Sequence, residues 1–390
     1  MCVIILNMKA ITKILAVTVA AVGAAALAGC SKSSSSSTTA TFANWNVRTA
    51  TSVEGNFTER WLNNSEIAEY SVSLEKGYNG VYGIDYNEGA SYQTAFGMVL
   101  GSVLPGMPEG YKNDIAADEP IYYYSTALSV SGSFYTKSGE TKNVYKEFND
   151  SVTSVCYFRL AGDNLKPLYS QQQMKTTAPN SLSASPLSST YIELNCAYTT
   201  YYNADCTEAT IMEKNLADDS AKETKKKVGL GSKAGYSVFD NSQLRAAVRA
   251  FNIKGGASHT FNVLVPQNGG MQTCHANCSS PTALDAEKED QAQIIGALDA
   301  CAQANPDYIF FDKGEGESAR AYRYNSVTMG INPSTDKMTG TSPSFWYSTV
   351  ENSEINSTKC VLLRMSTPLA FGLGTVNYTL KNLRLISNAE

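Results

Sequence analysis

Residues 236–265 read YSVFDNSQLRAAVRAFNIKGGASHTFNVLV and contain the best-delimited helix signal of the chain. Asp240–Ser242 offers three residues that favour a helix N-cap. An apolar stripe at helical spacing follows: Leu244, Ala247, Val248 and Phe251. Gly255 and Gly256 then supply a left-handed stop, and Phe261–Val265 alternates as a strand. Most of the remaining chain alternates like strands, so we expect this short helix to plug one large curved sheet.

Long stretches of the chain alternate between apolar and polar side chains, as half-buried strands do. The longest is Ile121–Tyr135, with mostly large apolar side chains at even positions and mostly small polar ones at odd positions. The same period recurs near residues 70–74, 155–157, 192–202, 361–365 and 376–385. The last stretch changes phase, which predicts a β-bulge. A polar turn over Ala217–Lys222 joins two further arms as a hairpin. The predicted fold class is mainly β, with a large curved antiparallel sheet forming a half-barrel or open barrel.

A second helix is indicated later in the chain. Thr282 and Asp285 resemble a capping box, and Asn305–Pro306 supplies a stop. The helical stripe between them consists of Ile294, Ile295, Leu298 and Cys301. We predict a helix over residues 283–304, inserted between strands of a single domain spanning residues 42–390. The Ser/Thr-rich stretch 174–190 is interpreted as a long loop, with a boundary between two β halves as the alternative.

The N-terminus carries an export signal. Lys9 and Lys13 precede an apolar run, Ile14–Ala28, which is too short to span a membrane. The run ends in Leu27-Ala28-Gly29-Cys30, which resembles the lipobox of bacterial lipoproteins. That resemblance implies a signal peptide over residues 1–29, lipid chains on Cys30 and a polar tether over residues 30–41. The predicted location is the exported side of a bacterial cell envelope, anchored to a membrane. An ordinary cleaved signal peptide is the alternative.

Composition narrows the classes of partner. The chain has 390 residues and a net charge of −5, and only 17% of its residues are charged. Binding to nucleic acid requires a basic face, so a nucleic-acid partner is not expected. The length is sufficient for a large core in one extended domain or two.

The cysteines allow few disulfides. Nine are present, and Cys2 and Cys30 belong to the export segment, which leaves an odd number for the fold. Cys196 with Cys206 and Cys274 with Cys278 are the candidate pairs, so we expect two bridges at most, or none. His275 lies between the second pair, but no second ligand pair for zinc accompanies it. No metal and no cofactor are therefore expected.

Candidate ligand-binding residues come from the tyrosines. The chain contains 23 of them, and those on strands could line a concave groove for an apolar or sugar ligand. The residues proposed for this groove are Tyr122, Tyr124, Tyr198 and Tyr202. The simpler interpretation is that tyrosine suits half-buried strands. No catalytic residues are assigned, because a glycosidase-type carboxylate pair leaves no spacing signature.

One family resemblance concerns the second half of the chain. Asp240-Asn241, Leu244-Arg245 and Arg249, with the strands that follow, resemble a segment of uncharacterised exported bacterial proteins related to lipoprotein-carrier (LolA-like) half-barrels. Phe345–Tyr347 resembles a closing strand of such proteins, as do residues 361–365 and 376–380. The resemblance covers residues 190–385, with residues 283–304 as an insertion. It implies an apolar groove and a role in lipid or envelope handling, which is a fold-level analogy.

Three functions remain open from the sequence. The first is a non-enzymatic surface lipoprotein that binds an apolar ligand or envelope component in a β groove. The second is a structural or adhesive surface lipoprotein without a small ligand, which a solid core would favour. The third is an anchored hydrolase, which requires a cleft with two carboxylates roughly 5 to 9 Å apart.

Overall fold

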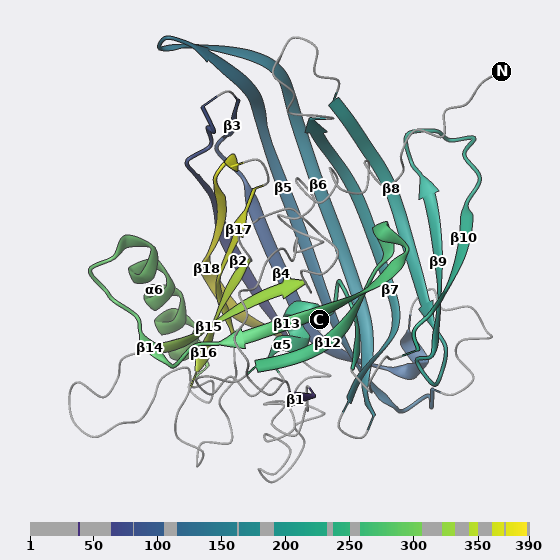
Figure 1. Ribbon diagram of the computed structural model, residues 1–390. Coiled ribbons are helices and arrows are strands. Elements are labelled where there is room, and N and C mark those ends of the chain that lie inside the picture. The colour runs from purple at the N-terminus through teal and green to yellow at the C-terminus, as the bar shows by residue number, and fades with distance from the viewer. Residues whose placement is uncertain are drawn as a thin grey trace, which may run out of the picture.

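The fold is that of a computed structural model. It describes residues 38–39, 64–80, 82–104, 115–161, 164–179, 191–231, 237–249, 258–305, 322–331, 343–349, 361–369 and 372–387. Figure 1 shows long strands standing side by side, with shorter strands crossing in front of them and a small helix between the two groups.

The described strands belong to one mainly antiparallel sheet. Its first half contains β2 (Asn64–Glu75), β3 (Gly83–Tyr86), β4 (Ser91–Leu100), β5 (Pro120–Ser138), β6 (Thr141–Ala161), β7 (Asn164–Pro179), β8 (Tyr191–Tyr202), β9 (Glu208–Asn215) and β10 (Thr224–Gly229). Its second half contains β11 (Val238–Asp240), β12 (Ser258–Val265), β13 (Gly270–Cys278), β14 (Thr282–Ala283), β15 (Arg323–Ile331), β16 (Ser344–Thr349), β17 (Leu362–Pro368) and β18 (Thr375–Ser387). The C-terminal strand β18 pairs with β2, which joins the two halves.

The sheet is open. Following the pairings, it runs from β10 through β9, β8, β7, β6, β5, β4, β2, β18, β17, β16, β15 and β13 to β12. At the β12 end two short strands pair in parallel, β11 and β1 (Thr38–Thr39). The predicted tether over residues 30–41 therefore includes two residues that join the sheet. The predicted fold class is confirmed.

Several strand predictions are confirmed in detail. The alternating stretch Ile121–Tyr135 lies within β5, and β9 and β10 form the predicted hairpin. The register between β18 and β2 shifts between Leu380 and Asn382, where the change of phase predicted a bulge. One boundary was wrong, because residues 174–179 continue β7 and are not a loop. Residues 180–190 lie outside the described part.

Two α-helices are described, and both differ from the predictions in length. The helix α5 is a single short turn, Leu244–Val248, and Phe251 and the glycine stop lie outside the described residues. The helix α6 spans Glu289–Ala304 and begins six residues later than predicted. Thr282 does not cap it, because Thr282–Ala283 pairs with β15 instead. Two 3₁₀ turns are also described, Gly101–Val103 and Pro266–Asn268. Neither α-helix is long and apolar enough to cross a membrane.

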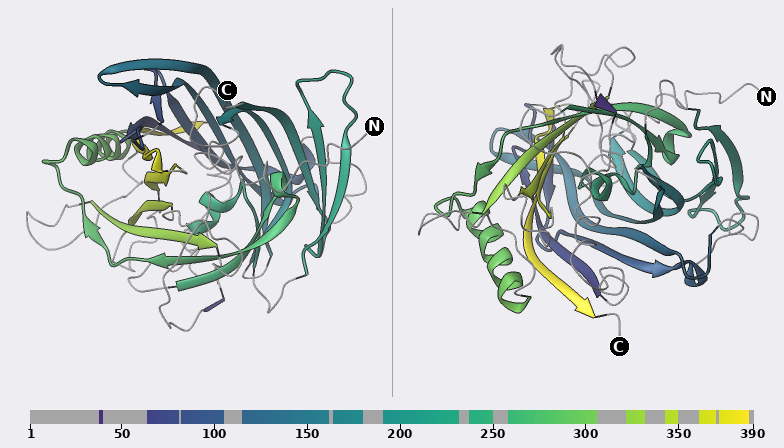
Figure 2. Two further views of the ribbon diagram at one scale, coloured as in Figure 1. Left: turned by 45° about the horizontal axis from the view of Figure 1, so that its top comes forward. Right: turned by 90° about the horizontal axis from the view of Figure 1, so that it is seen from below.

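The two helices lie on opposite sides of the sheet. The sheet curves around α5, while α6 packs outside it against β18 (Figures 1 and 2). On α6, Ile294, Leu298 and Cys301 are buried, and the Gln293 amide donates to the backbone oxygen of Leu380 at 2.9 Å. The face of β4–β8 turned toward α5 is called the inner face below, and the opposite face the outer face.

Candidate functional site

Residues 237–249, which comprise β11 and α5, fill the inner side of the sheet and are called the plug. All described residues of the plug except Val238 are buried, including both of its arginines. Together with the inner side chains of the strands they form one continuous apolar cluster. Burying this surface supplies the main stabilisation of the plug. The predicted plug helix therefore occupies the concave side of the sheet.

Asp240 attaches the plug to β7 and β8. Its carboxylate is fully buried and accepts hydrogen bonds from Ser170 Oγ and Tyr202 Oη, each at 2.6 Å. Its other oxygen accepts from the backbone N–H of Ser242 at 2.7 Å. Burial raises the pKa of Asp240, and these hydrogen bonds oppose the rise. Asp240 thus acts as a shared acceptor that connects two strands to the plug.

Arg249 attaches the opposite end of the plug to β2. Its guanidinium forms an ion pair with Glu66, and both side chains are nearly inaccessible, at 7% and 1% exposed. The guanidinium also lies over the ring of Phe96, 5.0 Å from its centroid. A buried pair of this kind holds its geometry because either charge left alone would carry a large desolvation cost.

Arg245, in the middle of the plug, contacts residues of β4, β16 and β17. Its guanidinium carbon lies 5.9 Å from the centroid of the Tyr92 ring, and its Nε donates to Met365 Sδ at 3.3 Å. The hydroxyl of Tyr347 donates to the backbone oxygen of Arg245 at 3.0 Å. The plug is thus fixed on three sides by side chains from strands far apart in the sequence.

The tyrosines proposed for an apolar groove lie in the core. Tyr122, Tyr124, Tyr198 and Tyr202 are 8%, 2%, 5% and 2% exposed. Tyr122 stacks between Phe96 and Phe158, with centroids 6.0 and 5.7 Å away. Tyr202 contacts the plug through Asp240. These four side chains are therefore buried in the core and form no open groove.

A small inner cavity adjoins Asp150 on β6. Its volume is about 10 Å³, enough for one water molecule. Its walls are Val72, Tyr86, Leu128, Val130, Phe148, Asp150, Val152, Thr176 and Tyr378. The Oδ1 atom of Asp150 has no hydrogen-bond partner among the described residues, and burial raises the pKa of this carboxyl to about 7. The cavity is too small for an organic ligand.

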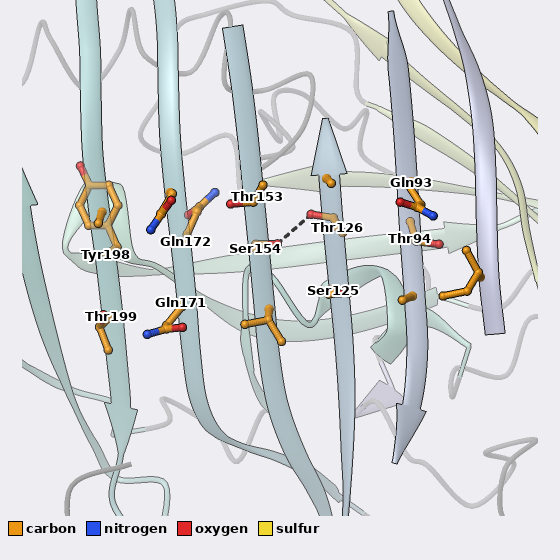
Figure 3. A pocket seen from close by; sticks show the side chains of 16 residues that line it. Gln93, Thr94, Ser125, Thr126, Thr153, Ser154, Gln171, Gln172, Tyr198 and Thr199 are labelled. Carbon is orange, nitrogen blue, oxygen red and sulfur yellow. Dashed lines mark hydrogen bonds between the residues drawn. The ribbon is translucent and has the colours of Figure 1, made fainter. Parts of the chain in front are cut away.

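A larger hollow of about 460 Å³ crosses strands β2 and β4–β8 (Figure 3). Its sixteen lining residues are Ile67, Gln93, Thr94, Ala95, Ser125, Thr126, Ala127, Thr153, Ser154, Val155, Gln171, Gln172, Gln173, Ala197, Tyr198 and Thr199. On these strands Gln93, Thr153 and Gln171 are exposed, while their neighbours Thr94 and Gln172 are buried toward the plug. The accessible side chains therefore belong to the outer face, and we call this site the outer hollow.

Two rows of directly paired residues form the accessible surface of the outer hollow. One row runs Gln93, Ala127, Thr153, Gln173 and Ala197. The other runs Ile67, Ala95, Ser125, Val155, Gln171 and Thr199. Small side chains alternate with amides and hydroxyls, which leaves a depression with hydrogen-bonding groups along it. The sequence predicted a small polar face on β5 but not that it continues across four neighbouring strands.

A row of tyrosines borders the outer hollow. Tyr123, Tyr157, Tyr169 and Tyr201 are paired in register on β5, β6, β7 and β8, two residues along from the second row. Successive ring centroids are 6.4, 6.0 and 5.2 Å apart. We call these residues the tyrosine row. The tyrosine row was not predicted from the sequence, although the alternation of the strands places these tyrosines on the face opposite Tyr122, Tyr124 and Tyr202.

The candidate disulfide pairs are free thiols in the structure. Cys274 and Cys278 lie on one strand, β13, where four residues span about 13 Å, beyond the roughly 7 Å reach of a disulfide. Cys196 pairs in register with Asn215, whereas Cys206 lies in the turn at the far end of β8. Spacing in the sequence did not distinguish residues along one strand from residues across a turn. The alternative of no bridges holds for the described cysteines.

The predicted lipidation site, Cys30, lies outside the described residues, and so does the signal peptide over residues 1–29. Their assignment remains a prediction from the sequence.

Comparison with known proteins gives a structural similarity but no match in sequence. No protein-family model matches the sequence, and no curated protein is detectably similar to it. Among solved structures, the chain is similar to a β-barrel-like protein of a domain of unknown function from Brucella abortus. The identity is 7%, the TM-score is 0.40, and the match covers 83% of this chain and 98% of that one.

Proposed function

We propose that this protein is a lipid-anchored envelope protein of bacteria that acts without catalysis, as a structural or adhesive surface protein. The observation that carries the proposal is the filled interior. The concave side of the sheet, where a carrier would hold its ligand, is occupied by the plug of the same chain. Buried polar contacts at Asp240 and Arg249 hold the plug in place.

The anchor is proposed from the N-terminal sequence. A basic segment, a short apolar run and Leu27–Cys30 occur in the order that lipid attachment requires. Lipid chains on Cys30 would bury methylene groups in the bilayer, each contributing about 0.8 kcal/mol. The folded domain would then face the exported side of the membrane.

Two other functions receive less support. A carrier of apolar ligands requires an open groove, but the tyrosines proposed for it are core residues. A hydrolase requires two accessible carboxylates, and the residues that line the outer hollow include none. The carboxylates of Asp240 and Glu66 are buried and hydrogen-bonded to other parts of the fold.

Two measurements test the proposal. Metabolic labelling with a fatty acid in the native host should label the wild-type protein, and Cys30→Ala should abolish the label. Native mass spectrometry of the detergent-purified protein should show the acylated chain without a further stoichiometric lipid. Cys206→Ala is the matched control, because it removes a cysteine of the fold and should keep the label.

The lipid anchor and the structural or adhesive role can each be refuted independently. An unlabelled wild type would refute the anchor. A stoichiometric lipid that persists in Cys30→Ala would show a bound apolar ligand and would refute the structural or adhesive role in favour of a carrier.

A further inference from the structure

We propose that the outer hollow, together with the tyrosine row, is a binding site for an uncharged polysaccharide chain. The proposal deepens the adhesive role by naming the class of ligand, and it rests on the proposed function for placing the site at the cell surface. The site is built on the long strands β4–β8, which hold its side chains in a fixed register.

The charge of the lining selects a neutral ligand. None of the sixteen residues that line the outer hollow carries a formal charge. Nucleic acids bind grooves lined by lysine and arginine, because the phosphates require counter-charges. The charges that flank the lining are of both signs, since Glu69 pairs with Gln93 and Lys214 pairs with Ala197, so they favour neither an acidic nor a basic polymer. The ligand is therefore polar and uncharged.

The hydrogen-bonding groups suit sugar hydroxyls. Gln93, Gln171 and Gln173 are exposed and each presents a carbonyl acceptor and an amide donor. Thr153 adds an exposed hydroxyl and Thr199 a partly exposed one, and each can donate or accept. Sugar hydroxyls can also donate or accept, so each amide and hydroxyl of the site can form a hydrogen bond with a sugar either as donor or as acceptor.

The tyrosine row supplies the apolar half of the recognition. A pyranose ring presents C–H groups on its faces, which pack on aromatic rings while its hydroxyls remain in polar surroundings. Tyr123, Tyr157 and Tyr201 are partly exposed. Tyr169 is buried with Leu104 and Ile121 in a separate apolar cluster that backs the row. Ser65 Oγ lies 2.6 Å from the hydroxyl of Tyr123, which fixes that ring.

The dimensions suit a chain of sugars better than a single one. Five neighbouring strands, β4 to β8, span roughly 19 Å at the usual strand spacing. On β5–β8 the two rows of the outer hollow and the tyrosine row run side by side across the strands. A repeating ligand can therefore contact several equivalent groups, so that the binding free energies of several weak contacts add.

The test is isothermal titration of the full-length protein in detergent with soluble neutral polysaccharides, namely dextran, mannan, xylan and β-glucan, and with heparin as an anionic comparison. We expect at least one neutral polymer to bind and heparin not to bind. Gln171→Ala combined with Gln173→Ala should weaken binding at least tenfold. Asn149→Ala is the matched control, because Asn149 is exposed on β6 outside the outer hollow and should leave binding unchanged.

Circular dichroism and the thermal midpoint of each variant establish that it is folded. Cys30→Ala should bind as the wild type does, so that loss of the anchor and loss of the site are distinguishable. The site is overturned if none of the neutral polymers binds, or if binding persists in the Gln171 and Gln173 variant. It is also overturned if that variant abolishes self-association, because the occupant would then be a second copy of the chain.

Discussion

The two faces of strands β4–β8 use polar side chains in opposite ways. On the inner face, Ser170 and Tyr202 bond the buried carboxylate of Asp240 from the plug. On the outer face, Gln171 directly follows Ser170 in the sequence, and its side chain is exposed. Thr199 directly precedes the buried Thr200 and is partly exposed. The inner polar groups are used within the fold, whereas the outer ones are available to another molecule. The comparison separates residues that maintain the structure from those that can bind.

The largest effect is expected at the buried ion pair of the inner face. Arg249→Met leaves Glu66 charged and buried without its partner, which should lower the free energy of unfolding by about 4 kcal/mol. Urea denaturation followed by circular dichroism measures the change. Combining Arg249→Met with Glu66→Leu should restore most of the loss.

The exposed pair of Arg384 and Glu69 is the matched control. Arg384→Ala should cost less than about 1 kcal/mol, because water screens an exposed pair. Equal losses in the two single variants would contradict the structural role assigned to the buried pair.

Asp240→Ala should have the next largest effect. It leaves the hydroxyls of Ser170 and Tyr202 without their acceptor inside the core, at a cost of about 3 kcal/mol. Asp240→Asn keeps an acceptor oxygen and should cost less. The measurement is the urea midpoint, with the slope compared to verify two-state unfolding. A larger loss for Asn than for Ala would contradict the role of acceptor.

Asp150 should make stability depend on pH. Burial raises its pKa from 3.8 to about 7, so the folded protein holds a proton there that the unfolded chain releases. Stability from this group is therefore present at low pH and lost as pH rises from 3.8 to about 7. Asp150→Asn should be more stable than the wild type by about 2 kcal/mol at about pH 5.5 and similar to it near pH 4.

Denaturation of both proteins at several pH values measures that difference. A constant difference between Asp150→Asn and the wild type across the range would exclude a raised pKa at Asp150.

The smallest effect is expected on the outer face. Gln171→Ala should change the free energy of unfolding by less than about 0.5 kcal/mol, as is usual for exposed side chains. Its neighbour Gln172 is buried and accepts a hydrogen bond from Gln267, so Gln172→Ala should cost about 1 to 2 kcal/mol. Thermal unfolding of the two variants compares the faces at adjacent positions. Equal losses would remove the distinction between them.

The sequence predicted the strands better than the site. Alternation located β5, β8 and the bulge in β18, because side chains with period two report which residues share a face. The pattern does not report which face meets the plug. Tyr122 and Tyr124 were therefore assigned to a groove, although they are buried, and the accessible Tyr123 was not considered.

Helix boundaries and cysteine pairing depended on tertiary contacts. The Thr282–Asp285 signal is local, but pairing with β15 placed Thr282 in a strand and moved the start of α6 to Glu289. Arg245 and Arg249 are not part of the apolar stripe that predicted the plug helix. Their burial could not be predicted, because their contacts Met365 and Glu66 come from strands distant in the sequence.

The position of the plug in the chain has a consequence for how the protein folds. Nine strands, β2–β10, precede the plug in the sequence, and Arg249 finds its partner 183 residues upstream. Synthesis and export both begin at the N-terminus. The apolar face of β2–β10 therefore stays exposed until residues 237–249 have been synthesised and exported. Contacts across such separations also form slowly. We expect this chain to depend on chaperones from the time the first strands are exported until the plug packs against them.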